Sequence, residues 1–278
     1  MRSLDVCGES LHLALVADGH GGKEASVLCA TTVLDLLVEA LGDEAPSGAA
    51  LQRAGTAAFL TIHERLLTDA KHTAGSTLTV CIVNAARAEV TTLHAGDSVA
   101  RLVGRKSAAL ALCEDHRIES SDDERARLSK LCDTLGGTLA RAMDRHGRPG
   151  GPLRLWPGSG PGVAQARVVG DRDVGAFIEP RPHACTVPLP PGESCSVLIC
   201  SDGVWDAMLP GAVDGVARST LCLPPGVSAR LVCNAALAQK HAYSSEGDEI
   251  PIDDTTVIVL RIEDEDDPLS GTSKPCCA

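Results

Sequence analysis

The chain has 278 residues, of which 44% are hydrophobic and 22% charged, so it is long and apolar enough to form a globular core and is not disordered as a whole. Its 25 basic and 37 acidic residues give a net charge of −12, and only 2% of its residues are aromatic. This balance disfavours nucleic-acid binding, suits a cation site, and leaves Leu, Val, Ala and Ile to build the core.

The first part of the chain predicts a strand followed by two long helices. Residues 11–17 are almost wholly apolar and run directly into DGHGG, which is typical of a buried strand that ends in a turn. Apolar residues recur at helical spacing over residues 23–41, and Gly42 ends that segment. After a Gly/Pro/Ser loop at 46–48, a second helix is expected over about 51–70.

Short strands dominate the rest of the chain. They are expected at 77–83, 89–95, 99–103, 186–188, 196–200 and 256–262. Further helices are expected at 122–131 and 227–241, and residues 145–162, which are rich in Gly, Pro and Arg, predict a long surface loop. Segregated strands and helices favour an α+β fold over a doubly wound sheet. We expect residues 1–262 to form one domain and the acidic segment 263–278 to be a disordered tail.

Six aspartates lie at strand ends or in the turns beside strands. They are Asp18, Asp97, Asp115, Asp202, Asp253 and Asp254. Side chains at strand ends can meet at one edge of a sheet, where carboxylates repel one another and raise one another's pKa. Cations relieve such repulsion, and Mg²⁺ and Mn²⁺ prefer carboxylate and carbonyl oxygens. The simpler alternative for each residue is that it caps a turn.

Seven segments that carry these aspartates or flank them form an ordered set of motifs. They are VADGHGG (16–22), AGSTLTV (74–80), HAGDSVAR (94–101), EDHR (114–117), PGVAQARVVGD (161–171), LICSDGVWDAM (198–208) and DDTT (253–256). In sequence and order they resemble the signatures of the metal-dependent serine/threonine protein phosphatases of the PP2C (PPM) family. The resemblance implies a PP2C-like α-β-β-α sandwich, in which two central antiparallel sheets are flanked by helices.

The same resemblance implies hydrolysis of phosphoserine and phosphothreonine in protein substrates with two Mg²⁺ or Mn²⁺ ions. It makes Asp18 the residue that bridges both ions and the Gly19 carbonyl a ligand of one. Asp202 and Asp253 would complete the other ion's site. A water shared by the ions would attack phosphorus in line, and His20 would protonate the leaving alkoxide.

Three further roles follow from the resemblance. Asp115 and Asp206 would join Asp202 around a weaker third ion. Asp171 would be a structural acid behind the ligands. Asp254 stands where the family usually has Asn, and it adds a negative charge beside the ions. No cysteine lies in a phosphate-cradling loop, which argues against the cysteine-based tyrosine phosphatases.

The start of the chain departs from the family pattern. The family normally has a further strand upstream, with a phosphate-binding arginine and an acidic motif beside the metals. Arg2 and Glu9 are the only nearby candidates before Asp18, and neither matches in position, so no phosphate-binding arginine is assigned. Loss of that strand would expose a sheet edge. Three explanations stay open: a truncated gene model, a natural short form, and a catalytically weak pseudophosphatase that acts as a binding or regulatory module.

Two other features bear on partners and location. Arginines in and beside the 145–162 segment could guide a phosphorylated substrate, although a solvated loop is the simpler interpretation; they are Arg141, Arg145, Arg148 and Arg154. No apolar run reaches the ~18 residues of a membrane span, and residues 1–10 do not resemble a signal peptide. With 12 scattered cysteines and no CxxC pair, we expect reduced thiols in an intracellular protein, cytoplasmic or nuclear.

Overall fold

The computed structural model describes residues 2–143, 146–158, 160–244 and 253–264. Its strands are β1 (Arg2–Val6), β2 (Glu9–Val16), β3 (Gly19–His20), β4 (Gly75–Ser76), β5 (Leu78–Asn84), β6 (Glu89–Ala95), β7 (Ala100–Gly104), β8 (Leu110–Ala111), β9 (Thr138–Met143), β10 (Pro149–Trp156), β11 (Val169–Gly170), β12 (His183–Pro188), β13 (Cys195–Cys200) and β14 (Val257–Ile262). Its α-helices are α1 (Glu24–Leu41), α2 (Gly48–Thr68), α3 (Asp122–Leu135), α4 (Asp202–Trp205), α5 (Pro210–Ser219) and α6 (Pro225–Ser244).

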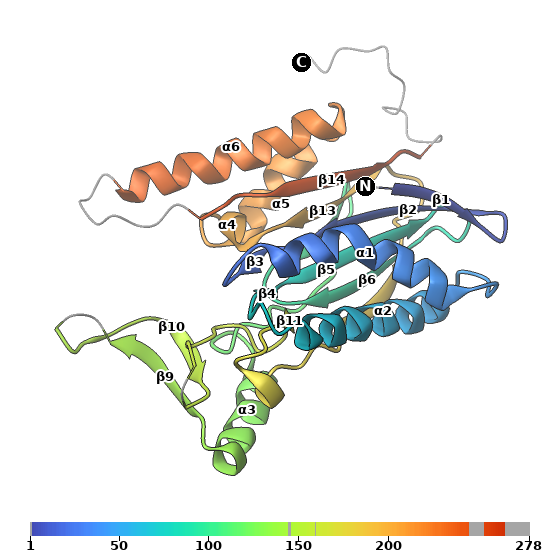
Figure 1. Cartoon of the computed structure of the whole chain (residues 1–278). Helices are drawn as coiled ribbons and strands as arrows, with labels where there is room; N and C mark the ends of the chain where they lie inside the picture. Colours follow the sequence, from blue (N-terminus) through green and yellow to red (C-terminus); the bar gives the residue numbers. More distant parts are fainter. Residues whose placement is uncertain (1, 144–145, 159, 245–252, 265–278) are drawn as a thin grey trace.

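Two antiparallel sheets stack face to face at the centre of the molecule (Figure 1). One has the strand order β1-β2-β5-β6-β12 and the other the order β14-β13-β7-β8. Their facing sides bury one aliphatic cluster, with Val16, Cys81 and Val90 from the first sheet and Val197 and Ile199 from the second. Because side chains alternate along a strand, the intervening residues point to the outer faces and need cover there.

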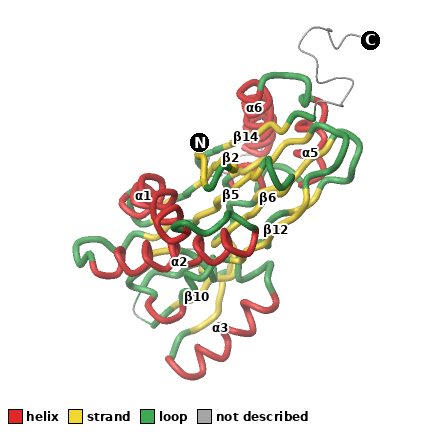
Figure 2. The backbone as a smooth tube through the Cα atoms, turned by 90° about the vertical axis from the view of Figure 1, so that its right-hand side faces the viewer, coloured by secondary structure: helices red, strands yellow, loops and turns green. Residues whose placement is uncertain are grey.

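Helices cover both outer faces of the sandwich. Helices α1 and α2 pack on the five-stranded sheet, where Phe59 and Leu93 are completely buried in the same cluster. Helices α5 and α6 pack on the four-stranded sheet through residues such as Val232, which meets Leu198. Figures 1 and 2 show these four layers from two directions. The α-β-β-α sandwich expected from the sequence is confirmed.

A third unit, formed by α3 and the β9–β10 pair, lies at one end of the sandwich (Figures 1 and 2). Here the prediction of a surface loop at 145–162 was wrong for residues 149–156, because β10 pairs antiparallel with β9 there. Leu155 is 1% exposed in a cluster with Leu128 and Phe177, and the Trp156 indole N–H donates to the Ala140 carbonyl (3.0 Å). These few inward residues outweigh the Gly/Pro/Arg composition that indicated a loop.

The start of the chain also differs from the expectation. Residues Arg2–Val6 form a strand, β1, that pairs antiparallel with β2 through a two-residue turn. Both turn residues have positive φ, 52° at Cys7 and 78° at Gly8, as the right-handed twist of a tight hairpin requires. Helix α5, at Pro210–Ser219, is a further element that the sequence analysis did not predict.

Other expectations concern the chain at large. The expected disordered tail, 263–278, lies outside the described residues except for its first two positions. The ten cysteines within the described ranges are free thiols. Within those ranges, none of the helices combines the length and the apolar character needed to cross a membrane.

Three histidine rings lie close together, two of them on strands of the five-stranded sheet. The rings of His94, on β6, and His116 are 4.7 Å apart and nearly parallel, and His183, on β12, meets His116 edge-on at 6.4 Å. Thr79 Oγ1 lies 2.8 Å from His94 Nδ1, whereas His94 Nε2 is buried without a hydrogen-bond partner. Burial lowers the pKa of His94 to about 4 and that of His116 to about 2, so both rings are neutral at physiological pH.

We expect acid to destabilise the fold through His94. Its folded-state pKa lies below the ordinary 6.5, so the unfolded chain binds the proton first, and stability falls as the pH drops from about 6.5 towards 4. Between pH 7.5 and 5 the loss from this one group is on the order of 2 kcal/mol. Urea unfolding at both pH values measures it, with His94→Asn, which has no titrating ring, as the comparison. An equally steep loss in the variant would contradict this assignment.

Candidate active site

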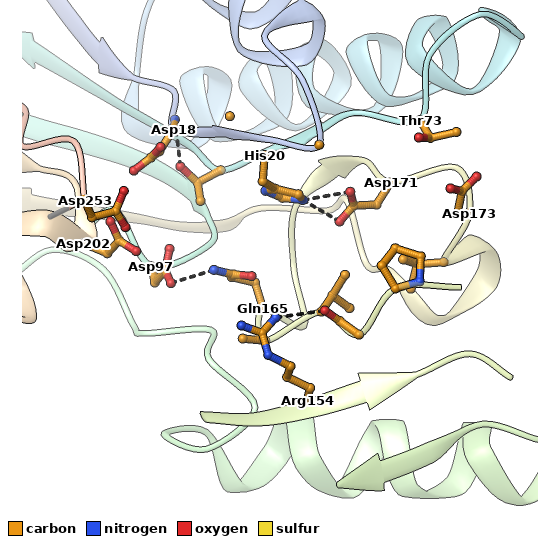
Figure 3. Close-up of a pocket in the computed structure, with 18 residues that line it drawn as sticks. Asp18, His20, Thr73, Asp97, Arg154, Gln165, Asp171, Asp173, Asp202 and Asp253 are labelled. Atoms are coloured by element: carbon orange, nitrogen blue, oxygen red, sulfur yellow. Dashed lines mark hydrogen bonds and ion pairs between the residues drawn. The ribbon is translucent and has the colours of Figure 1, made fainter. Parts of the chain in front are cut away.

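A cavity of about 420 Å³ opens where the sandwich meets the α3 and β9–β10 unit (Figure 3). Its acidic lining residues are Asp18, Asp97, Asp171, Asp173, Asp202 and Asp253, and Gly19, His20, Gln165 and Arg154 also line it. Figure 3 shows His20 and Asp171 facing each other, with a group of acids further along the wall: Asp18, Asp97, Asp202 and Asp253. Residues from opposite ends of the sequence therefore share one small space.

The segment that contains β4 fixes the backbone around Asp18. The Asp18 N–H donates to Thr77 Oγ1 (3.1 Å), and the Thr77 N–H donates back to the Asp18 carbonyl (2.9 Å). The Ser76 hydroxyl donates to the same carbonyl (3.1 Å), and Ser76 also pairs with Gly19 across β3 and β4. The GST and DGH motifs, 55 residues apart, therefore form one rigid unit.

The second pair of acids is held where β13 ends and β14 begins. Ser201, just after β13, donates its hydroxyl to the Asp254 carbonyl (3.2 Å), which ties the two segments together. A Cβ atom on Gly203 would overlap that same carbonyl, so the close approach requires glycine at this position. Asp202 and Asp253, one on each segment, are thereby brought into the same cavity.

These acids are crowded and poorly compensated. Burial, together with the charges of Asp97 and Asp253, raises the pKa of Asp202 to about 8. Burial and the charge of Asp253 also raise the pKa of Asp18. One carboxylate oxygen of Asp202, Oδ1, is buried and has no hydrogen-bond partner. The other oxygen, Oδ2, lies 3.8 Å from Arg117 Nη2, so the charge of Asp202 is only partly compensated.

The donor set fits a hard divalent cation such as Mg²⁺ or Mn²⁺. It offers carboxylate oxygens, the Gly19 carbonyl and the unpartnered oxygen of Asp202, which are the ligand types these ions prefer. Within the described ranges, no three acidic, histidine or cysteine side chains already converge on one point as a closed ligand set does. Asp18, Asp202 and Asp253 are the residues that could hold ions here.

His20 and Asp171 form an ion pair beside the acids. The ring Nε2 lies 2.7 and 2.8 Å from the two carboxylate oxygens of Asp171, which is 5% exposed. Burial alone lowers the pKa of His20, but the hydrogen bond and charge of Asp171 outweigh it and raise that pKa above its ordinary value. Gly75 lies directly beneath, and a Cβ there would clash with both side chains. The ring is therefore held in place and favours its protonated form.

Other predicted residues lie outside this cavity's lining. Asp254 instead lines an adjoining cavity of about 540 Å³ on the other side of Asp18. Asp115 accepts the backbone N–H of Arg117 (2.9 Å), and the half-exposed Asp206 accepts from the Arg117 side chain (2.6 Å). Of the six residues expected as metal ligands, four line the main cavity, and the two proposed for a third ion alone do not.

The two residues weighed at the start of the chain are engaged elsewhere. Arg2 pairs with Asp35 on α1, and Glu9 accepts hydrogen bonds from Arg87 (2.7 Å) and Asn84 (2.7 Å). Neither Arg2 nor Glu9 lines the acidic cavity. The structure therefore gives neither residue a place at the phosphate-binding position.

Three further side chains complete the walls of the cavity. Asp97, 3% exposed, accepts hydrogen bonds from Gln165 Nε2 and Arg117 Nε, both at 2.9 Å. Arg154 reaches the cavity from β10 and donates to the Gly162 carbonyl (2.9 Å). Asp97 lies in the turn of the HAGDSVAR motif, and Arg154 is one of the four arginines weighed in and beside the 145–162 segment. Gln165 lies in the PGVAQARVVGD motif but was given no role from the sequence.

We expect Asp171→Asn to lower the pKa of His20, because the variant removes the charge that stabilises the protonated ring. NMR titration of the His20 ring protons measures this downward change. Asp173→Asn is the matched control, since Asp173 also lines the cavity but makes no bond to His20. An unchanged His20 titration in Asp171→Asn would show that the pair does not persist in solution.

The chain is similar to known proteins over most of its length. A family profile described as "Protein phosphatase 2C" matches residues 6–246. "Probable protein phosphatase 2C 5" of Arabidopsis thaliana is 32% identical over 254 residues, which cover 89% of this chain and 53% of that protein. "Probable protein phosphatase 2C 40" of Oryza sativa subsp. japonica is 34% identical over 250 residues, covering 88% and 49%. The chain thus spans about half the length of the curated relatives it matches.

Solved structures show the same fold. A serine-threonine phosphatase 2C from Toxoplasma gondii superimposes with a TM-score of 0.66 at 16% identity, covering 91% of this chain and 89% of that one. A C. elegans sex determining protein gives a TM-score of 0.71 at 21% identity, covering 90% and 56%. The profile match over most of the chain, on a sandwich with these acids at one end, shows that the chain belongs to the protein phosphatase 2C family.

Proposed function

We propose that this chain hydrolyses phosphoserine and phosphothreonine in proteins with the help of two divalent cations, Mg²⁺ or Mn²⁺. The observation that carries the proposal is the meeting of Asp18, Asp202 and Asp253 in one cavity beside the His20–Asp171 pair. The family is metal-dependent, and carboxylates crowded into one cavity, one of them with an unpartnered oxygen, are what a cation site needs. An electronegative cavity without cations would repel a phosphate.

When bound, the ions supply a nucleophilic water at neutral pH and neutralise charge on the phosphoryl oxygens. The chain itself contributes to this step by holding the ligand groups in place. Asp18 and the Gly19 carbonyl are fixed by the bonds to Ser76 and Thr77, so these ligands need little reorganisation. Asp202 sits beside them, with its unpartnered Oδ1 available as a ligand.

His20 acts as the proton donor in this proposal. A seryl or threonyl alkoxide is a poor leaving group unless it is protonated as it departs. Asp171 holds the ring through Nε2 and raises the pKa of His20, which favours the protonated ring that a proton donor needs. Gly75 leaves the space that this ion pair occupies.

A second candidate function is a catalytically weak module that binds phosphoproteins without turning them over. The observation that favours it is the position of Arg2 and Glu9, which are paired elsewhere and leave the substrate phosphate without an arginine from the start of the chain. Measuring both metal binding and substrate turnover separates the two functions, because both functions predict metal binding and only the phosphatase predicts turnover.

We expect the purified chain to hydrolyse p-nitrophenyl phosphate and phosphoserine or phosphothreonine peptides with Mn²⁺ or Mg²⁺, and not with EDTA. Asp18→Ala and Asp202→Ala should each reduce kcat by roughly 100-fold or more, because each removes a ligand from the ions. The exposed Asp133→Ala, on α3, is the matched control for loss of one negative charge. A folded chain that binds Mn²⁺ and shows no turnover would favour the binding module instead.

Arg154 is the side chain best placed to meet a substrate phosphate in this proposal. It lines the cavity on the β10 side, across from the acids (Figure 3). Its Nη1 donates to a backbone carbonyl, which orients the guanidinium and leaves further N–H groups for an anion. Arg141, on the neighbouring strand, is instead paired with the carboxylate of Glu119.

We expect Arg154→Gln to raise KM for a phosphopeptide by about tenfold, the worth of one charge-assisted hydrogen bond. The kcat should change less, because the ions and His20 are untouched. Steady-state kinetics with a phosphothreonine peptide measures both constants, and Arg141→Gln serves as the control from the same strand pair. Equal effects of the two substitutions would argue for general electrostatic attraction and against a specific contact.

A further inference from the structure

The guanidinium of Arg117 lies among three carboxylates at the edge of the acidic cavity. Its Nε donates to Asp97 Oδ2 (2.9 Å) and its Nη1 to Asp206 Oδ1 (2.6 Å). Its Nη2 lies 3.8 Å from Asp202 Oδ2. The Arg117 side chain is 24% exposed and that of Asp97 only 3%, so the contacts are partly shielded from water. All three branches of the guanidinium thus face an acid.

Asp202 is the point at which this arrangement meets the proposed metal ligands. Its Oδ2 faces Arg117, whereas its Oδ1 is buried and unpartnered. Oδ2 can therefore interact with the Arg117 guanidinium while Oδ1 stays available as a ligand for a bound ion. Asp206 is left with no place in the main cavity, and Asp115 contributes only a bond to the Arg117 backbone N–H (2.9 Å).

We propose that Arg117 is a built-in cation that takes the place of a third divalent ion in this chain. The proposal rests on the proposed function, since it assumes that ions bind at Asp18, Asp202 and Asp253. In this arrangement Arg117 neutralises Asp97, Asp202 and Asp206 and orients Asp202 toward the ions. Arg117 is therefore a positioning residue and not a ligand.

The chemistry of arginine suits this role. A guanidinium stays protonated at every physiological pH and has five N–H donors in a fixed plane, which match several carboxylates at once. Because it is part of the chain, its occupancy does not depend on the concentration of free metal. A divalent ion at the same place would have to displace two short hydrogen bonds and would then meet the positive charge of Arg117 nearby.

The neighbouring backbone holds Arg117 in place. Arg117 and Gln165 form an antiparallel β-bridge, and both side chains donate to Asp97. Asp115 caps the backbone of Arg117 from the other side. The guanidinium is thus anchored at its backbone as well as at its tip, as expected for a permanent member of the site.

The test measures Mn²⁺ binding to the full chain without substrate. Isothermal titration calorimetry and the EPR signal of free Mn²⁺ each give the number of bound ions. The wild type should bind two ions, and Arg117→Lys, which keeps the charge, should do the same. Arg117→Gln should bind a third ion, because the competing positive charge has gone. Arg101→Gln is the control, since it breaks another largely buried arginine–aspartate pair, with Asp214 (2.6 and 2.7 Å).

Asp206→Asn keeps the test decisive if Arg117→Gln does not fold. We expect this half-exposed substitution to leave the number of bound Mn²⁺ ions at two. Three ions in the wild type, falling to two in Asp206→Asn, would overturn the role of Arg117 and leave the proposed phosphatase function intact. Unchanged Mn²⁺ binding in a folded Arg117→Gln would overturn it as well. A wild type that binds no Mn²⁺ would overturn the proposed function itself.

Discussion

Repulsion among carboxylates is the constraint around which this molecule is arranged. Asp18 follows β2, Asp202 follows β13 and Asp253 precedes β14, so the stacked sheets bring their charges together wherever the strand ends meet. The aliphatic core between the sheets supplies the free energy that holds them there against that repulsion. Arg117 and Gln165 relieve part of it. The unpartnered Oδ1 of Asp202 shows that the repulsion is not fully relieved.

The third unit is connected to the sandwich through the same acids. The bridge between Arg117 and Gln165 belongs to this unit's base, and both side chains reach Asp97 in the turn after β6. The Ala166 N–H donates to the His116 carbonyl (2.8 Å) one position further along. The β9–β10 pair therefore cannot shift far from the sandwich without breaking contacts to a buried aspartate. The position of the β9–β10 pair and the electrostatics of the cavity are linked in this way.

Much of this could be predicted from the sequence, because it depends on local pattern. Continuous apolar runs predicted β5 and β13, helical spacing predicted α1 and α2, and ordered motifs predicted the acids at the strand ends. The ion pairs of Arg117 could not be predicted, because its partners Asp97 and Asp206 are 20 and 89 residues away and only the tertiary fold selects them. The β9–β10 pair was missed because its Gly/Pro/Arg composition hides the few inward residues, such as Leu155, that stabilise it.

The absence of a side chain at Gly75, which leaves room for the His20–Asp171 pair, has a consequence for interpreting related sequences. The His20–Asp171 pair occupies the volume that any side chain at position 75 would need, so the glycine and the ion pair depend on each other. A homologue that keeps the acidic ligands but replaces this glycine must have moved its histidine. Such a protein could still bind ions while lacking an aligned proton donor. The residue at position 75 therefore indicates whether a relative has room for this histidine–aspartate pair in the same place.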